Sequence, residues 1–169
     1  GRLPTLADLK NLPYTLQVLK ESMRIFPPVW NLNGRTALED VEIGGYVIPQ
    51  GDDVFLSPYV MHHQPKYFPE PGRFDPERFT PENEAKLPRY AYIPFGAGPR
   101  ICIGNSFAMM EAQLIIAAVA QRYRLRLARP APVAPLPRIT MSPDGGLPMR
   151  LEPRTAVAKQ PPEGALMLA

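Results

Sequence analysis

The spacing of apolar residues near the start of the chain predicts an amphipathic helix. Across residues 5–26, leucine and methionine recur every three or four positions, which places them on one face of a helix. Pro27 and Pro28 then end the pattern, because proline has no N–H to donate and its ring clashes with the preceding turn. Pro13 lies inside the window, so we expect a kink or a restart there and a secure helix over residues 14–24.

A second helix is predicted from Phe107 to Tyr123. Nearly every position in this run is apolar, and Asn105 and Ser106 just before it supply candidate N-terminal caps. A helix that is apolar on all sides is usually buried. We therefore expect this helix to lie in the centre of the fold.

Short β-rich runs separated by glycine and proline predict small antiparallel sheets. One group of runs lies between the two helices, and the other group follows the second helix. The predicted strands are Val41–Ile43, Tyr46–Ile48, Val54–Leu56, Leu125–Leu127, Arg138–Met141 and Met149–Leu151. The fold class is therefore mainly α with small antiparallel sheets.

Proline dominates the stretch from Pro65 to Pro99, which holds eight prolines and seven aromatic residues. The whole chain has 23 prolines, nearly three times the usual share of about 5%. This stretch is too rich in proline for long regular elements and too apolar for a free linker. We expect an ordered meander.

Length and composition predict one compact body. The chain has 169 residues, of which 45% are hydrophobic and 21% charged, an ordinary composition for a globular protein of one domain. The scaling of surface with mass lets about 70% of the open chain's surface be buried, which is ample for a core. Residues 155–169 show no periodicity, and we expect a loose tail there.

The charge and cysteine content limit the partners and the compartment. The net charge is +3, with no run of five or more like charges, which argues against a nucleic-acid partner. Cys102 is the single cysteine, so no disulfide can form within the chain and an intracellular, cytoplasmic location is expected. No window of about 18 apolar residues is present. Because the chain opens on Gly1 and soon enters a helical pattern, we expect that a preceding part is missing, and a membrane anchor in that part stays open.

The residues with the most specific chemistry form a glycine-spaced loop, Phe95–Gly104. Glycines at this density let the backbone turn sharply and lie flat against a planar ligand. Cys102 comes within one turn of the second predicted helix, whose N-terminal dipole stabilises the negative charge of a thiolate. A thiolate so placed would pair with a positive group, and the nearby Arg100 offers a guanidinium fork that suits a carboxylate.

Two further motifs lie earlier in the chain. Glu21 and Arg24 stand three residues apart on the first predicted helix, so their side chains can pair. The run Phe74–Phe79 contains the sequence P-E-R-F, with Arg78 as its arginine.

Together, the loop F-x-x-G-x-R-x-C-x-G, the E-x-x-R motif and the P-E-R-F motif resemble the cytochrome P-450 family in residues, order and spacing. The resemblance covers about residues 5–153. It implies that residues 1–154 form the C-terminal, haem-binding part of a single cytochrome P-450 domain, since family members are more than twice this length. In the family, the helix that activates oxygen precedes this part, so we expect the isolated chain to be inactive.

The resemblance also implies roles for the loop residues. Cys102 would be the axial ligand of the haem iron, where a thiolate donates electron density that favours O–O cleavage. Phe95 would pack beside the sulfur, and Gly98 and Gly104 would let the loop approach the porphyrin closely. Arg100 would hold a haem propionate.

The resemblance further implies that Arg78 of the P-E-R-F motif joins the pair of Glu21 and Arg24. Two guanidinium groups around one carboxylate are satisfied only if they are buried and hydrogen-bonded, so the expected role is to fix the meander to the helix.

The cofactor implied by the resemblance is haem b, and Arg35 matches a second position that holds a propionate. The implied partners are O₂, a small organic substrate and an electron donor, either a ferredoxin or a flavin reductase. Arg89, Arg122 and Arg124 would give that donor a basic face. The implied enzyme is a monooxygenase, an oxidoreductase that inserts one atom of O₂ into its substrate.

Other readings of the sequence stay open. Some members of the family rearrange or dehydrate peroxides without O₂ or a redox partner, and the preceding helix would discriminate between the two reactions. A third interpretation is not enzymatic, because residues 129–135 fit the R-x-x-P-x-x-P pattern of proline-rich ligands for adaptor modules.

Position in the chain indicates which residues contact the substrate, and it argues against a metal site at the two histidines. Val29, Trp30 and Leu32 follow the first helix in a segment that passes the haem in the family, so they are candidate pocket residues, as is the turn over residues 143–147. His62 and His63 are adjacent and would face opposite ways on an extended segment, which argues against a shared metal ion.

Overall fold

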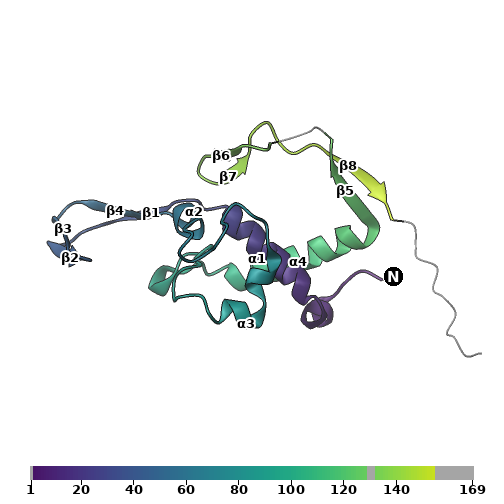
Figure 1. Ribbon diagram of the computed structural model, residues 1–169, viewed down its shortest axis with the longest axis horizontal. Helices are drawn as coiled ribbons and strands as arrows, with labels where there is room; N and C mark the ends of the chain where they lie inside the picture. The colour runs from purple at the N-terminus through teal and green to yellow at the C-terminus, as the bar shows by residue number, and fades with distance from the viewer. Residues whose placement is uncertain (1, 129–131, 155–169) are drawn as a thin grey trace, which may run out of the picture.

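The computed structural model describes residues 2–128 and 132–154 (Figure 1). The helices are the 3-10 helix η1 (Leu6–Asn11), α1 (Pro13–Ile25), α2 (Pro58–His62), the 3-10 helix η2 (Pro76–Phe79), α3 (Pro81–Glu84), the 3-10 helix η3 (Gly98–Arg100) and α4 (Asn105–Arg122). The strands are β1 (Leu32–Thr36), β2 (Val41–Ile43), β3 (Tyr46–Ile48), β4 (Asp53–Leu56), β5 (Tyr123–Leu127), β6 (Pro135–Pro137), β7 (Met141–Pro143) and β8 (Met149–Pro153). The predicted tail and the first residues of the proline-rich motif lie outside the described residues.

The restart expected at Pro13 is confirmed, because η1 ends before it and α1 begins on it. At the first position of a helix, the missing N–H of proline costs no hydrogen bond and its fixed φ suits the helix. At the other end, the Phe26 N–H donates to the Ser22 carbonyl at 2.8 Å. α1 packs against both η2 and α4, so it connects the meander to the second long helix.

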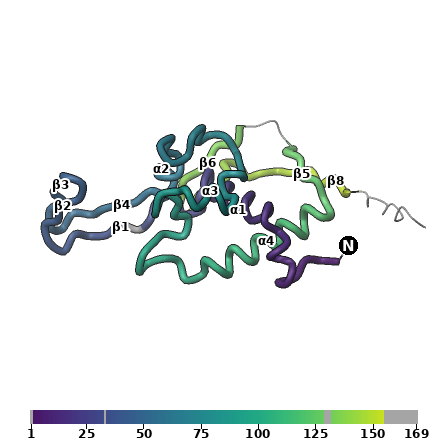
Figure 2. The backbone as a smooth tube through the Cα atoms, turned by 60° about the horizontal axis from the view of Figure 1, so that its bottom comes forward, coloured from purple at the N-terminus to yellow at the C-terminus, as the bar shows by residue number. Residues whose placement is uncertain are grey.

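The strands form four two-stranded antiparallel sheets, pairing β1 with β4, β2 with β3, β5 with β8 and β6 with β7. Figure 2 shows the β1–β4 pair as a long arm that carries the β2–β3 hairpin at its tip. The fold class of helices with small antiparallel sheets is therefore confirmed. The sequence pattern missed β1 because Asn33 and Gly34 interrupt its apolar positions.

The strand expected over residues 138–141 is wrong. Residues 138–140 form the turn between β6 and β7, and only Met141 belongs to a strand. The two neighbouring strands contain Pro135, Pro137 and Pro143, which the pattern discounts. Proline is tolerated here because each strand of a two-stranded ribbon is an edge strand, with one side that needs no N–H.

α4 does not lie in the centre of the described chain, contrary to expectation. Its Phe107 is 62% exposed and Ile115 is 55% exposed. The reason is that η1 and α1 pack against it without surrounding it. Nor do Asn105 and Ser106 cap it through their side chains, because the helix begins at Asn105 and Gly104 takes the cap position.

The apolar core of the described residues is small and sits in the meander, which is ordered as predicted. Its buried apolar side chains are Phe68, Phe79, Ala91 and Ile93. The expectation of an ample core is therefore wrong for this part of the chain, since large apolar side chains on α4 and on the β-hairpins remain exposed. The most deeply buried large side chains include charged ones, which form part of the site described next.

Candidate functional site

Cys102 sits in a loop that hydrogen bonds fold back on itself. The Cys102 N–H donates to the Phe95 carbonyl at 2.9 Å, and the Asn105 N–H at the start of α4 approaches the Cys102 carbonyl at 3.3 Å. Between these points, η3 makes one turn that ends at Arg100. The loop thus presents a free, exposed thiol just before the long helix.

Two glycines in the loop adopt a backbone that other residues rarely reach. Gly96 has φ +75° and Gly98 has φ +66°, values in the left-handed region where a Cβ is strained. Gly104 is different, because its φ is ordinary and a Cβ there would lie 3.8 Å from the Cys102 sulfur, a normal contact. Glycine is therefore required by the turn itself at Gly96 and Gly98.

A cavity of about 1020 Å³ opens beside the thiol, at the upper end of the range for small-molecule and cofactor sites, roughly 300–1,000 Å³. Its lining is mostly apolar. The lining includes Phe95, Arg100 and Cys102 from the loop, Arg35 from β1, and Val29 and Leu32 from the segment after α1. The structure therefore brings these six sequence-predicted residues to one cavity.

Some predicted residues lie outside this lining, and some lining residues were not predicted. Trp30 is not among the lining residues, and neither is the turn over residues 143–147. Instead, Ile139 and Thr140 of the β6–β7 turn reach the cavity, and Gly96 rather than Gly98 or Gly104 faces it. Two turns follow one another in this segment, and the one between β6 and β7 lines the cavity instead of the one between β7 and β8.

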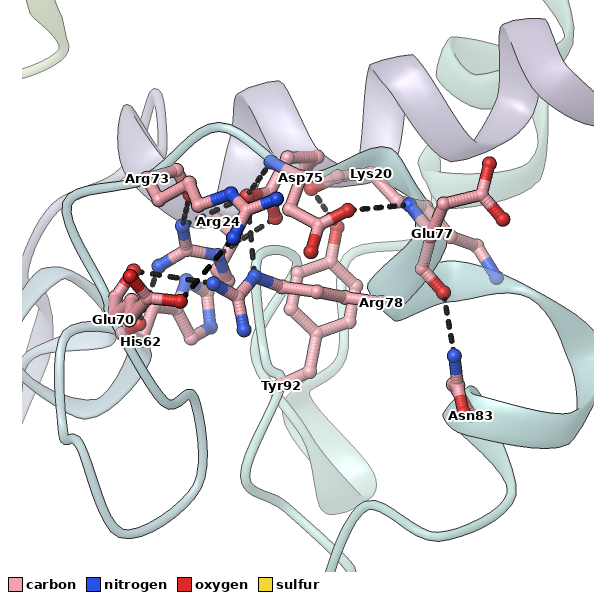
Figure 3. A network of polar contacts seen from close by, with 11 residues as sticks. Lys20, Arg24, His62, Glu70, Arg73, Asp75, Glu77, Arg78, Asn83 and Tyr92 are labelled. Atoms are coloured by element: carbon pink, nitrogen blue, oxygen red, sulfur yellow. Dashed lines mark hydrogen bonds and ion pairs between the residues drawn. The ribbon is translucent and has the colours of Figure 1, made fainter.

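A second group of residues, Glu21, Arg24 and Arg78, forms what we call the buried charge cluster. Figure 3 shows the Arg24 and Arg78 side chains within it. Glu21 and Arg24 are fully buried and pair through two bonds, Nε to Oε2 at 2.7 Å and Nη2 to Oε1 at 2.8 Å. The Arg78 Nε lies 3.5 Å from the Glu21 Oε1. Breaking such a buried pair from one side is costly, since it leaves an unpaired charge.

The buried charge cluster binds the main chain of the meander. Arg24 donates to the carbonyls of His62 at 3.0 Å and Arg73 at 3.2 Å. Glu21 accepts from the Asp75 N–H at 2.8 Å, and Arg78 donates to the Glu70 carbonyl at 3.1 Å. The bonds to Arg73 and Asp75 tie α1 to the meander, which is the role expected for the cluster, and the bond to His62 ties α1 to the end of α2.

His62 links the buried charge cluster to the segment that leads into the cysteine loop. Its ring is fully buried, and its Nε2 accepts from the Ile93 N–H at 2.9 Å. Burial, together with the positive charges of Arg24 and His63, lowers the pKa of His62 to about 4, so the ring is neutral at neutral pH. Because Nε2 accepts, the ring proton lies on Nδ1.

The expectation that His62 and His63 lie on an extended segment is wrong. Pro58 and Ser57 start α2, with the Ser57 hydroxyl accepting from the Val60 N–H at 3.3 Å, and His62 is its last residue. The two rings nevertheless point into different surroundings, because successive residues at the end of a helix lie on different sides of it. His63 binds the Tyr59 carbonyl through Nδ1 at 2.7 Å, one turn back along α2.

The arginines expected to form a basic face are all exposed. Arg122 ends α4 and Arg124 lies in β5, whereas Arg89 follows α3 and places its guanidinium 4.6 Å from the centre of the Tyr90 ring. Their exposure makes them accessible to a charged partner.

Comparisons with known proteins find similar sequences and similar folds. The family model for cytochrome P450 matches residues 1–147. Cyclooctatin synthase of Streptomyces melanosporofaciens is 45% identical over 154 residues, covering 91% of this chain and 33% of the relative. Cyclooctat-9-en-7-ol 5-monooxygenase of the same organism is 44% identical over 161 residues, again covering 91% and 33%. The solved structure of retinoic acid-bound cyanobacterial CYP120A1 superposes with a TM-score of 0.85 at 32% identity, covering 91% of this chain and 35% of that one.

The chain belongs to the cytochrome P-450 family, and its fold is that of the C-terminal part of a cytochrome P-450. It spans about a third of the length of these two curated relatives. No helix in the described ranges is long and apolar enough to cross a bilayer.

Family membership implies a haem cofactor, and the cavity fits one. The porphyrin is flat and apolar, its iron takes a thiolate ligand, and its two propionates are anionic. The cavity offers an apolar lining, one exposed thiol, and the guanidinium groups of Arg35 and Arg100, with no carboxylate among the lining residues. The donor set therefore matches the chemistry of this group.

Proposed function

We propose that the protein of which this chain is part is a haem-thiolate monooxygenase, which inserts one oxygen atom of O₂ into an organic substrate with electrons from a redox partner. The observation that carries the proposal is the exposed Cys102 thiol at the edge of a mostly apolar cavity that also receives Arg35 and Arg100. Haem b, when bound, supplies the oxygen chemistry at its iron.

In this proposal the main residues of the cavity have distinct roles. Cys102 would hold the iron through its sulfur, and the bond from its N–H to the Phe95 carbonyl at 2.9 Å keeps the loop folded at that point. Arg35 and Arg100 would orient the cofactor by pairing with its carboxylates. Gly96, with its left-handed backbone, keeps the loop free of a side chain at the cavity wall.

The proposed substrate is a mainly apolar organic molecule. Support comes from the lining residues beyond the cysteine loop, which include Val29, Leu32 and Ile139 and would exclude water from a bound ligand. Two similar proteins agree in kind, since one is named for its action on cyclooctat-9-en-7-ol and another was solved with retinoic acid.

The electron donor is proposed to be a protein or a domain with an acidic surface, either a ferredoxin or a flavin reductase. The exposed Arg89, Arg122 and Arg124 support an electrostatic approach. The proposed location is the cytoplasm, because a reducing compartment keeps the lone Cys102 as a thiol available for iron.

The carbon monoxide spectrum of the reduced full-length protein tests the proposal. We expect the red-shifted band that marks thiolate ligation, and we expect Cys102→Ala to lose it. Ser106→Ala is a matched control, because it removes a small polar group from the first turn of α4 outside the cavity lining. A haem-loaded wild-type protein without the red-shifted band would contradict ligation by Cys102.

A further inference from the structure

Trp30, the single tryptophan of the chain, joins two segments that are more than a hundred residues apart in sequence. Its indole Nε1 donates to the Arg138 carbonyl at 2.6 Å. Its own carbonyl accepts from the Ser57 hydroxyl at 2.7 Å and from the Tyr59 N–H at 3.3 Å. The backbone of Trp30 is therefore fixed at the start of α2, and its side chain reaches from there to the β6–β7 turn.

A second hydrogen bond holds the other end of the same turn. The Met141 N–H donates to the Pro28 carbonyl at 2.7 Å. Residues 138–140 form the turn between β6 and β7, so one bond attaches its first residue and the other attaches the residue just after it. We call these two bonds, Trp30 to Arg138 and Met141 to Pro28, the turn clamp.

The residues held between the two bonds line the cavity. Ile139 and Thr140 belong to its lining, together with Pro28 and Val29 from the segment that anchors the clamp. Ile139 is 95% exposed, so packing against the described residues does not fix its side chain. Its position is set by the backbone of the turn, and the turn clamp holds that backbone.

We infer that Trp30 is a positioning residue for the substrate, acting through the turn clamp on Ile139 and Thr140. Its indole N–H fixes the turn, and the turn fixes the wall of the cavity formed by these two side chains. The inference rests on the proposed function, which supplies the substrate. It also explains why Trp30 itself need not touch the cavity.

Two ligands of different size separate this role from a general structural one. In the full-length protein, imidazole and 4-phenylimidazole are titrated and the shift of the haem absorption band gives each dissociation constant. Trp30→Phe keeps an aromatic ring but loses the N–H, and loss of a neutral hydrogen bond changes an equilibrium by roughly twofold to tenfold. We expect 4-phenylimidazole to bind that much more weakly, while imidazole, which lacks the phenyl ring, binds as before.

A double-mutant cycle tests the route of the effect. If Trp30 acts through Ile139, then Trp30→Phe should change the affinity for 4-phenylimidazole much less in the background of Ile139→Ala. Tyr46→Phe is the matched control, because Tyr46 is 78% exposed on β3 and loses a polar group outside the cavity lining. Equal weakening of both ligands, no weakening of either, or additive effects in the cycle would overturn the inference.

Amide hydrogen exchange gives a readout that needs no haem. Trp30→Phe should speed exchange at residues 139–142 and leave α1 and α4 unchanged. Unchanged exchange in the turn would overturn the turn clamp even if ligand affinity changed. If the wild-type protein showed no haem band at all, the proposed function would fail, and the exchange result would still decide whether Trp30 holds the turn.

Discussion

Acidification tests the account of His62 directly. In the unfolded chain, this ring has the ordinary histidine pKa of about 6.5. In the folded protein, burial and the nearby Arg24 and His63 lower the pKa to about 4. Between these two pH values, the ring is protonated in the unfolded state and neutral in the folded state, so the free energy of unfolding falls as the pH falls.

The size of the effect follows from the same two values. One pH unit in that window corresponds to about 1.4 kcal/mol, so the interval from about 6.5 to about 4 amounts to about 3 kcal/mol. The stabilisation is fully present above pH 6.5 and is lost as the pH approaches 4. Since folded domains have about 5–15 kcal/mol of stability in total, a change of this size is large enough to measure.

Urea unfolding at a series of pH values from 7 to 4 measures the effect. His62→Gln does not titrate, and its side-chain carbonyl can still accept from the Ile93 N–H. We expect the wild type to lose about 3 kcal/mol more than His62→Gln over this range, while Gln64→Ala, an exposed and uncharged control nearby, follows the wild type. Carboxylates that titrate near pH 4 affect all three proteins alike. Parallel curves for the wild type and His62→Gln would refute the reasoning.

Two further substitutions test the buried charge cluster and the loop. Glu21→Ala leaves Arg24 buried without its carboxylate and should lower the free energy of unfolding in urea by about 3–5 kcal/mol. The control Lys20→Met, at the neighbouring position, should lower it by less than about 1 kcal/mol because the Lys20 ion pair is partly exposed. Similar losses in the two variants would contradict the role of the buried charge cluster. Gly96→Ala and Gly44→Ala both place a Cβ on a left-handed backbone and should each cost about 1–2 kcal/mol, but only Gly96→Ala should also lower the haem content of the purified protein. Equal haem content in the two variants would show that Gly96 does not shape the cavity.

The sequence carried the local chemistry of the site well, because that chemistry depends on spacing within one segment. Glu21 and Arg24 are one helical turn apart, and their pairing needs only the helix to form. The break at Pro13 follows equally from the geometry of proline. Phe95, Arg100 and Cys102 meet at one cavity because they belong to one loop of ten residues. The start of α4 fixes one end of this loop, and the hydrogen bond to the Phe95 carbonyl fixes the other.

Contacts between distant segments were beyond the sequence pattern. The hydrogen bond from Trp30 to Arg138 depends on the position of the β6–β7 turn. The sequence pattern did not predict this turn, because the prolines on both sides of Ile139 made the two strands look irregular. His62 looked like part of an extended pair, because a five-residue helix is too short to produce a periodic pattern. The exposure of α4 was unpredictable for a different reason, since an apolar helix carries no information on how many sides its neighbours cover.

The polar bonds from Glu21, Arg24 and Arg78 reach carbonyl oxygens and an amide nitrogen of the meander, and every amino acid except proline offers both groups. The bonds from the cluster therefore do not depend on which side chain stands at positions 70, 73 and 75, whereas Asp75 also caps η2 through its own carboxylate and Glu70 holds a left-handed backbone with φ +50°. Three charged side chains can in this way hold the course of a loop through groups that belong to its backbone.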